Sequence, residues 1–380
     1  EEFLRGRAEH LAGIRRAFFQ PGRHILIHGL RGVGKSSLAQ TAAFQLSEGI
    51  DPILVGCDRS STFSSVIRDI FDSAESLDPR LTEKTRELAG GFSKFGITAK
   101  GKVQLKYDQK VDPSSINEAV RLMDFISKSI EGKPVFVVDE FDLLKDASEQ
   151  EAFADFAKQL SDRHINVRFI FCGIAQSAEL LMAAHASVDR YFHTIDLGRL
   201  PWEARFEIVK EAARQLGLHI DDTTVIRIAM ISDGFPHYVR FISEKLFWCI
   251  FEANNEGNAT PRLFEDAMIK ASDAMDMKLR APYEKATRKY QNDYEYVLWA
   301  AADGHEFTRR SSDIFASYER IMRYLDEEAL PREKFNQRIN ALKKPTHDGV
   351  LTGSRQGWYE FTEKMLRGYV RLRAAQADVS

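Results

Sequence analysis

The chain has 380 residues, 44% of them hydrophobic and 29% charged, so it can bury a sizeable core and its length suggests two or three domains. A formal net charge of -3 excludes a strong global attraction to nucleic acid or acidic lipid. Cys57, Cys172 and Cys249 form no C-x-x-C pair, which argues against a disulfide framework or a zinc site and favours a cytoplasmic setting. No apolar run approaches the roughly 18 residues that span a bilayer, and no basic-then-apolar signal opens the sequence, which begins at Glu1.

Residues 1–200 alternate short apolar runs with stretches of helical pattern. This alternation predicts a parallel sheet with helices on both faces, the α/β class. Continuous apolar runs such as Val135–Val138 are typical of strands buried on both sides. The predicted strands are His24–His28, Pro52–Gly56, Val135–Val138, Val167–Cys172 and His193–Leu197.

An insertion at residues 90–110 interrupts the alternation. Apolar and polar residues alternate on both sides of Lys100-Gly101, which predicts a β-hairpin. Its polar face carries Lys94, Lys100, Lys102 and Lys106. This face is either a contact surface for DNA or a neighbouring subunit, or a solvated edge whose lysines oppose aggregation.

Residues 201–277 are predicted to be helical throughout and to form a small lid. One helix covers Trp202–Leu216, with Gly217 as its C-terminal cap, and a second covers Thr223–Ser232. A third covers Pro236–Phe251. Thr260-Pro261 starts a fourth, with Thr as the cap and Pro at the first helical position.

Residues 278–380 contain a charged segment, Lys278–Lys289, predicted to link the lid to a last unit. That unit has three predicted helices followed by two short strands, which is the element order of a winged helix. The helices are Asp293–Ala302, Ser311–Tyr324 and Pro331–Lys344, and the strands are Val350–Thr352 and Trp358–Phe361.

The segment from Gly29 to Ser36 fits the phosphate-binding pattern G-x-x-x-x-G-K-[ST] between a predicted strand and a helix. Such a loop curls its backbone N–H groups around phosphates, and the helix N-terminus adds a positive dipole. Lys35 would place its charge on the β- and γ-phosphates of ATP, and the Ser36 hydroxyl would ligate Mg²⁺. The residues expected to line the phosphates are Gly29, Arg31, Gly32, Val33, Gly34, Lys35, Ser36 and Ser37.

A pair of carboxylates, Asp139 and Glu140, ends the buried strand Val135–Val138. In parallel sheets, ligands bind at the carboxyl ends of the strands, so this pair is expected to face the phosphate loop. Asp139 would hold Mg²⁺ through water. Glu140 would act as the general base that polarises the attacking water.

These motifs make the chain resemble AAA+ ATPases of the origin-recognition and initiator clade, and related STAND-like bacterial ATPases. The Asp139-Glu140 pair matches the family's Walker B motif. The opening Phe3–Arg7 with Glu9 is similar to a family segment that packs over the adenine, which makes Gly6 and Arg7 base-pocket candidates. The resemblance covers roughly residues 3–275 by motif, and implies an AAA+ core, a helical lid and a C-terminal winged helix.

The same resemblance implies two further catalytic candidates. Gln176 stands where the family has its sensor 1 residue, usually Asn, and would contact the lytic water or the γ-phosphate. Arg190, in Ser187–Phe192, matches the family's arginine finger, which acts in the neighbouring subunit's site and implies a homo-oligomer. The other interpretation of Arg190 is a surface arginine with a structural role.

The lid segment from Gly234 to Arg240 departs from the initiator pattern. Initiators have a sensor 2 arginine three residues after the glycine, where this chain has His237. The Gly-x-Pro order is closer to the STAND-like branch. Either His237 or Arg240 is therefore the candidate that reaches the γ-phosphate.

The third helix and the wing of a winged helix are the elements that contact DNA. The candidate nucleic-acid residues here are Arg332, Lys334, Arg338, Lys343 and Arg355. Many acidic residues share the unit, so its charge is near neutral, and winged helices also bind proteins. The sequence leaves two functions open: an oligomeric, Mg-dependent ATPase that acts on DNA, or a STAND-like switch that passes its nucleotide state to a protein partner.

Overall fold

In a computed structural model of the protein, the described residues are 4–47, 51–77, 113, 115–130, 132–144, 146–175, 179, 181, 188–253, 257–275, 277–287 and 292–379. The chain divides into two compact units: Glu1–Leu30 with Lys35–Gly198, and Arg199–Ser380 with the loop Arg31–Gly34. Within the described ranges, no helix is long and apolar enough to cross a membrane. The predicted hairpin at residues 90–110 lies outside the described residues.

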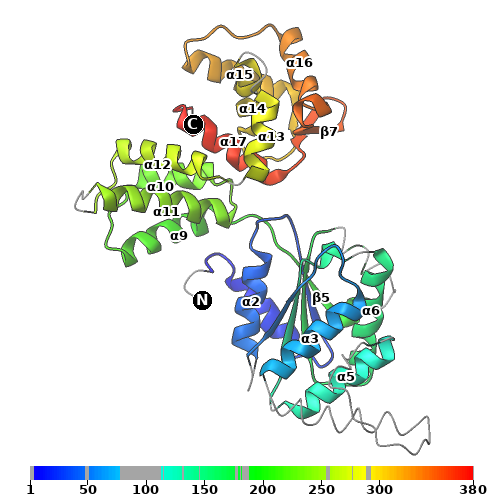
Figure 1. Ribbon diagram of the computed structural model, residues 1–380. Coiled ribbons are helices and arrows are strands. Elements are labelled where there is room, and N and C mark those ends of the chain that lie inside the picture. The colour runs from blue at the N-terminus through cyan, green and yellow to red at the C-terminus, as the bar shows by residue number, and fades with distance from the viewer. Residues whose placement is uncertain are drawn as a thin grey trace, which may run out of the picture. The chain divides into compact units, whose positions relative to one another are not determined.

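The first unit is built on a five-stranded parallel sheet with the order β2-β3-β4-β1-β5, and helices cover both of its faces (Figure 1). This confirms the predicted α/β class. The strands are β1 (His24–His28), β2 (Ile53–Gly56), β3 (Val135–Asp139), β4 (Arg168–Gly173) and β5 (Phe192–Asp196). The helices are α1 (Ala8–Phe18), α2 (Lys35–Leu46), α3 (Phe63–Leu77), α5 (Ile116–Ser129), α6 (Ala147–Asp162) and the short α8 (Val188–Tyr191).

The burial of each strand follows from its place in the sheet. The three central strands β3, β4 and β1 are buried almost continuously, as expected for strands covered on both faces. The edge strand β2 alternates between buried and exposed residues, and the edge strand β5 mixes buried, half-buried and exposed residues. All five predicted strands are therefore confirmed, with ends that shift by at most one residue.

Phenylalanine rings fill the core between the sheet and the α3–α6 side. Phe153 of α6 lies at the centre of this cluster, with ring centroids 4.8 Å from Phe63, 5.4 Å from Phe141 and 5.6 Å from Phe171. Phe136 stacks on Phe169 across neighbouring strands at 4.9 Å. Rings that meet edge-on or offset add to the apolar burial, so this side of the sheet is a rigid platform.

The second unit begins with four helices: α9 (Trp202–Gln215), α10 (Asp222–Ile231), α11 (Pro236–Glu252) and α12 (Pro261–Asp273). They confirm the helices predicted for the lid. The caps follow the sequence signals: Thr260 accepts a hydrogen bond from the Leu263 N–H, and Gly217, after the end of α9, has φ +68°.

The rest of the second unit contains three predicted helices, α14 (Asp293–Ala302), α15 (Ser311–Tyr324) and α16 (Arg332–Ala341). They are followed by the predicted strands, β7 (Leu351–Arg355) and β8 (Trp358–Phe361), which form an antiparallel hairpin. A two-residue strand, β6 (Arg309–Arg310), pairs with the other side of β8. This is the element order of a winged helix.

Two helices of the second unit were not predicted. The charged segment expected as a linker is the helix α13 (Met277–Thr287), and a C-terminal helix, α17 (Lys364–Gln376), follows the hairpin. Helix α17 packs against α10 and α12 of the lid and also against α13 and α14. Both predicted ranges, 201–277 and 278–380, thus lie in one compact unit, and the boundary between them stays a prediction.

Candidate ATP site

The phosphate-binding loop follows β1 and leads directly into α2. Its glycines Gly29, Gly32 and Gly34 have φ values of +147°, +79° and +95°. Residues other than glycine rarely adopt such angles. A Cβ on Gly29 would lie 2.4 Å from the carbonyl oxygen of Leu197, so the loop and the end of β5 approach too closely for any other residue. Arg31 is exposed and Val33 is buried.

Lys35, at the first position of α2, folds back over this loop. Its ammonium donates to the carbonyl oxygens of Gly29 at 3.1 Å and of Leu30 at 3.0 Å. Ser36, half-buried, and Ser37, exposed, follow in the first helical turn. A cation and a helix N-terminus beside a glycine-rich loop form the donor set that phosphates require.

The two acidic residues lie at the end of β3, at the same edge of the sheet as the loop. Strand β4 separates β3 from β1, and its pairing places Val138 opposite Phe171 and Ile27 opposite Cys172. Neighbouring strands lie about 4.8 Å apart, so the backbones of Asp139 and Ile27 are roughly 10 Å apart across β4. That spacing leaves room for phosphates and a cation between Asp139 and the loop.

Cys172 of β4 lies between the strands that carry the two halves of the site. Burial raises the pKa of its thiol well above the ordinary value. The charge of Asp139 raises it further, and the charge of Lys35 opposes the rise. The loop cation and the strand carboxylate therefore both act on one buried sulfur. The backbone N–H of Cys57 donates to the backbone carbonyl of Asp139 at 2.9 Å, and the charge of Asp139 is one cause of the raised pKa of the Cys57 thiol, after burial.

Glu140 adopts an unusual backbone conformation for its residue type. Its φ is +53°, in the left-handed region, and its N–H donates to the Asp139 carboxylate at 2.9 Å. Non-glycine residues in this region cost free energy and concentrate at active sites. The turn directs Glu140 away from the buried strand, where it is exposed while Asp139 stays half-buried.

The base-pocket candidates lie in the turn before α1. Gly6 has φ +68°, and Arg7 is buried, with its guanidinium donating to the Gly198 carbonyl at 2.7 Å. Burial lowers the pKa of Arg7 to about 10. Arg7 therefore fastens the N-terminal segment to the chain just after β5, near the carbonyl that contacts Gly29. This contact places the N-terminal segment beside the phosphate-binding loop. It does not show that the Arg7 guanidinium contacts an adenine base, so that role stays a prediction.

Gln176 lies outside the described residues, and Arg190 lies at the opposite edge of the sheet from the loop. Arg190 is exposed on α8, two residues before β5 begins. Because β5 is parallel to β1, its first residue is at the amino edge of the sheet, whereas Gly29 and Asp139 follow the carboxyl ends. A strand of five residues spans roughly 16 Å, so Arg190 faces away from its own subunit's site.

The two sensor 2 candidates both lie in the first turns of α11, in the second unit. His237 is exposed and stacks on Phe241, with ring centroids 5.7 Å apart and an interplanar angle of 18°. Arg240 is exposed one turn along the helix. The structure distinguishes neither as the sensor, so both stay candidates.

Two of the predicted nucleic-acid residues on α16 are held by contacts within the second unit. Arg338 donates to the Asp293 carboxylate at 3.3 Å and lies 5.0 Å from the Tyr294 ring. Arg332 donates to the Ser311 hydroxyl at 2.8 Å. Lys334 and Lys343 are exposed. These contacts favour Lys334 over Arg338 as a group available to a phosphate backbone.

The wing carries a basic residue that the sequence analysis missed. Arg310 of β6 pairs with Trp358 of β8, which pairs on its other side with Arg355 of β7. The two guanidinium carbons lie 4.9 Å and 4.0 Å from the indole. Arg310 stands between the predicted helices, so only the pairing of β6 with the hairpin places it on the wing.

Comparison with known proteins agrees with this geometry. Residues 4–170 match the family model described as "AAA ATPase domain". No curated protein matches the sequence. A solved structure, a Walker-type ATPase of Pyrococcus abyssi, is 16% identical, with a TM-score of 0.53, and the match covers 97% of this chain and 96% of that chain. At this identity the likeness extends to the fold.

Two further solved structures are similar over most of their length. The ORC1 protein of Aeropyrum pernix, in complex with DNA, is 15% identical, with a TM-score of 0.46, over 99% of this chain and 94% of that chain. A RuvB mutant of Thermotoga maritima is 15% identical, with a TM-score of 0.46, over 95% and 93%. With the family match over the phosphate loop and the acidic strand, the resemblance drawn from the motifs is confirmed: residues 4–170 belong to the AAA ATPase domain family.

Proposed function

We propose that this protein binds ATP with Mg²⁺ and hydrolyses it as an oligomer that acts on DNA or on a DNA-bound complex. One observation carries the proposal: the loop that leads into Lys35 and the strand carboxylate Asp139 lie at the same edge of the sheet, with Cys172 of β4 between their strands. Cation, carboxylate and glycine-rich loop are the parts that phosphoryl transfer to water requires.

The residues present fit a nucleotide and its cation. The N–H groups of the loop and the ammonium of Lys35, which now donates to backbone carbonyls, would bind the phosphates. Ser36 and Asp139 supply the oxygen ligands that Mg²⁺ prefers, and the cation would neutralise charge on the β- and γ-phosphates. Glu140, turned out of the strand by its left-handed backbone, would accept the proton of the attacking water.

The placement of Arg190 supports an oligomer. Because Arg190 lies at the amino edge of the sheet, it reaches a γ-phosphate only in a neighbouring copy. A planar, permanent cation there would stabilise the charge of the transferring phosphoryl group. Mixing two inactive variants, Lys35→Ala and Arg190→Ala, tests this directly. Mixed oligomers contain some sites with both residues intact, so we expect activity to return in part, whereas no recovery at any mixing ratio would contradict action in trans.

The experiment that tests the proposed function is the steady-state ATPase rate with Mg²⁺, with and without duplex DNA, at two salt concentrations. Lys35→Ala should abolish ATP binding, and Glu140→Gln should retain binding while turnover falls at least about 100-fold. Stimulation by DNA that weakens steeply with salt is expected, because phosphate contacts release counterions. Normal turnover by Glu140→Gln would show that this carboxylate is not the base.

A second function, a STAND-like switch that acts on a protein partner, is favoured by the contacts of α16. Arg332 and Arg338 bind Ser311 and Asp293 of their own unit, which leaves fewer cations for DNA. A slow ATPase rate that is indifferent to DNA, together with a nucleotide-dependent oligomeric state, would favour the switch. Under both proposals ATP acts through its different affinities for two conformations.

A further inference from the structure

A buried carboxylate holds together the two halves of the second unit. Asp233 lies in the turn between α10 and α11, with its side chain 2% exposed. Three arginines surround it: Arg199 at 2.6 Å, and Arg367 and Arg371 at 3.3 Å each. Arg199 precedes the first lid helix, whereas the other two arginines belong to α17, at the end of the chain.

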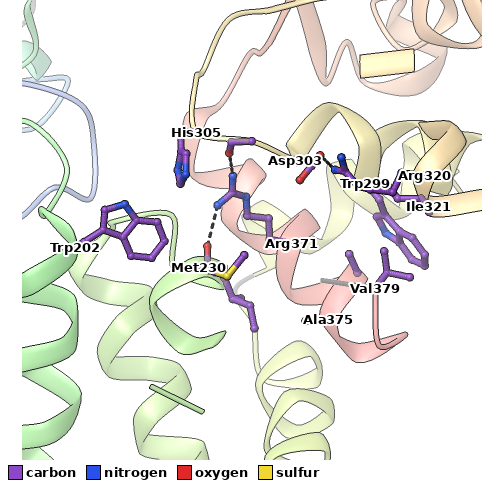
Figure 2. Close-up of a pocket in the computed structure, with 13 residues that line it drawn as sticks. Trp202, Met230, Trp299, Asp303, His305, Arg320, Ile321, Arg371, Ala375 and Val379 are labelled. Carbon is purple, nitrogen blue, oxygen red and sulfur yellow. Dashed lines mark hydrogen bonds and ion pairs between the residues drawn. The ribbon is translucent and has the colours of Figure 1, made fainter. Parts of the chain in front are cut away.

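The same arginines bind the loop that follows α14. Arg367 donates to the carbonyl oxygens of Ala302 at 3.1 Å and His305 at 3.3 Å. Arg371 donates to the carbonyl oxygens of Ala302 at 2.8 Å and of Gly304. It also donates to the Met230 carbonyl of the lid at 2.8 Å (Figure 2). Through this cluster the lid turn, the loop Ala302–His305 and α17 share one set of charged hydrogen bonds.

The arginines lie together because Asp233 compensates them. Burial and, to a smaller extent, the charge of Arg371 lower the pKa of Arg367 to about 9, while the charge of Asp233 opposes the decrease. Two buried guanidinium groups repel each other where water does not screen them. Without the carboxylate, three cations would crowd a junction between helices, and the negative charge of Asp303 would still act on Arg371.

Apolar packing alone does not hold this junction. A cavity of about 230 Å³ lies beside Arg371, between Trp202 and Met230 of the lid and Trp299 and Ile321 of α14 and α15 (Figure 2). The two halves therefore leave a gap where a continuous apolar interface would be closed. The charged cluster bridges that gap, as Figure 2 shows for Arg371 between Met230 and the loop that ends at His305.

The position of Asp233 ties this junction to α11. Gly234 follows it with φ +78°, and a Cβ there would lie 2.7 Å from the Arg205 guanidinium and 3.0 Å from the Arg199 Cβ. Four residues further, the Tyr238 hydroxyl donates to the Met365 carbonyl of α17 at 2.8 Å. The turn that carries Asp233 therefore fixes the start of the helix that bears both sensor 2 candidates.

We propose that Asp233 is a positioning residue that locks the start of α11 to α17, so that the lid helices and the C-terminal helices move as one body. This inference rests on the proposed function in one respect: a nucleotide-driven change in the lid would then reach α16 and the wing. The lock itself is a property of the second unit and exists without nucleotide.

The test is hydrogen exchange on the full chain, comparing Asp233→Asn with native protein. Asparagine keeps the size of the side chain, removes its charge and replaces one acceptor oxygen with a donor NH2 group. We expect exchange in α17 and the loop Ala302–His305 to rise at least about tenfold, because removing one member of a buried charged cluster is costly. The matched control is Asp222→Asn, whose carboxylate pairs with Lys210 at 2.7 Å but is 81% exposed. Unchanged exchange in Asp233→Asn would overturn the proposal.

A second variant separates lost charge compensation from general unfolding. Arg367→Met removes one of the crowded cations, and we expect its effect on exchange to be at least about fivefold smaller in the Asp233→Asn background than in native protein. Equal effects in both backgrounds would contradict a charge-coupled lock. The change in exchange caused by Arg367→Met is measured in native protein and in Asp233→Asn. The two changes can therefore be compared even if Asp233→Asn alone destabilises the protein.

The change in hydrogen exchange on binding nucleotide distinguishes coupling from a merely structural role of Asp233. On adding ATP and Mg²⁺ to native protein, we expect exchange to change in both α11 and the α16–β8 region, and in Asp233→Asn to change in α11 alone. A response that reaches the wing in both proteins would overturn the coupling. If native protein shows no nucleotide response at all, the proposed function fails, while the nucleotide-free comparison still decides the lock.

Discussion

The two compact units bury their largest side chains in opposite chemical settings. The first unit surrounds Phe153 with other phenylalanine rings, so its core depends on non-directional apolar packing. The second unit also buries aromatic side chains such as Tyr238 and Tyr318, but it buries Arg367 completely, next to Asp233, so the junction of α17 with the lid depends on specific pairs of charges as well. An apolar core provides a rigid base for an ATP site, whereas a charged junction loses its cohesion when one partner is lost.

The largest loss of unfolding free energy is expected from Phe153→Ala in the first unit. The ring is 0% exposed and contacts at least three other rings, so its removal leaves a cavity that the rigid sheet cannot fill. We expect the free energy of unfolding to fall by about 3–5 kcal/mol. Chemical denaturation followed by near-UV circular dichroism measures it. Phe19→Ala, at an 81% exposed position, should stay within about 0.5 kcal/mol, and a similar loss in both variants would refute a localised core.

A smaller effect is expected where α17 meets α11 in the second unit. A Cβ on Gly368 would lie 2.4 Å from the Tyr238 ring, and both belong to regular helices that shift little. Gly368→Ala should therefore cost about 1–3 kcal/mol of unfolding free energy, despite the higher helix propensity of alanine. Thermal unfolding measures this cost. In a Tyr238→Leu background the cost should shrink, and an undiminished cost would mean that the clash is not with that ring.

The sequence predicted the first unit better than the second because the first unit follows apolar patterns. Continuous apolar runs marked β3 and β4, and the glycine spacing marked the phosphate loop before any geometry was known. Helix α13 was missed because its charges hide Leu279, Tyr283 and Ala286, which recur at helical spacing and are buried.

Functional residues, too, were predicted where a local sequence motif marks them and missed where only long-range packing places them. Lys35, Ser36, Asp139 and Glu140 were predicted because a local motif marks each of them, and the structure brings them to one edge of the sheet. Arg367 and Asp233 carry no such signal, since arginines and aspartates are mostly exposed and only long-range packing buries these two. The edge position of Arg190 follows from strand order, which no local pattern specifies.

The last comparison is acid sensitivity, to which a fully buried histidine of the first unit contributes. His24, at the start of β1, is fully buried and accepts a hydrogen bond from the Phe169 N–H at 3.2 Å. Burial and, to a smaller extent, the charge of Arg168 lower its pKa from 6.5 to about 3. The folded chain therefore keeps the ring neutral while the unfolded chain takes up a proton below pH 6.5. The stability of the first unit is then fully present above pH 6.5 and falls as the pH drops toward 3.

At about 1.4 kcal/mol per pH unit, this histidine should cost the folded state roughly 2 kcal/mol by pH 5. His24→Gln retains an acceptor for the Phe169 N–H and cannot be protonated, so the slope of unfolding free energy between pH 6.5 and 5 should flatten by about that amount. His164→Gln, at an exposed position of the same unit, should leave the slope as it is. Urea titrations at several pH values measure both. An unchanged slope in His24→Gln would mean that other groups cause the acid sensitivity and that the buried ring is not kept neutral by the fold.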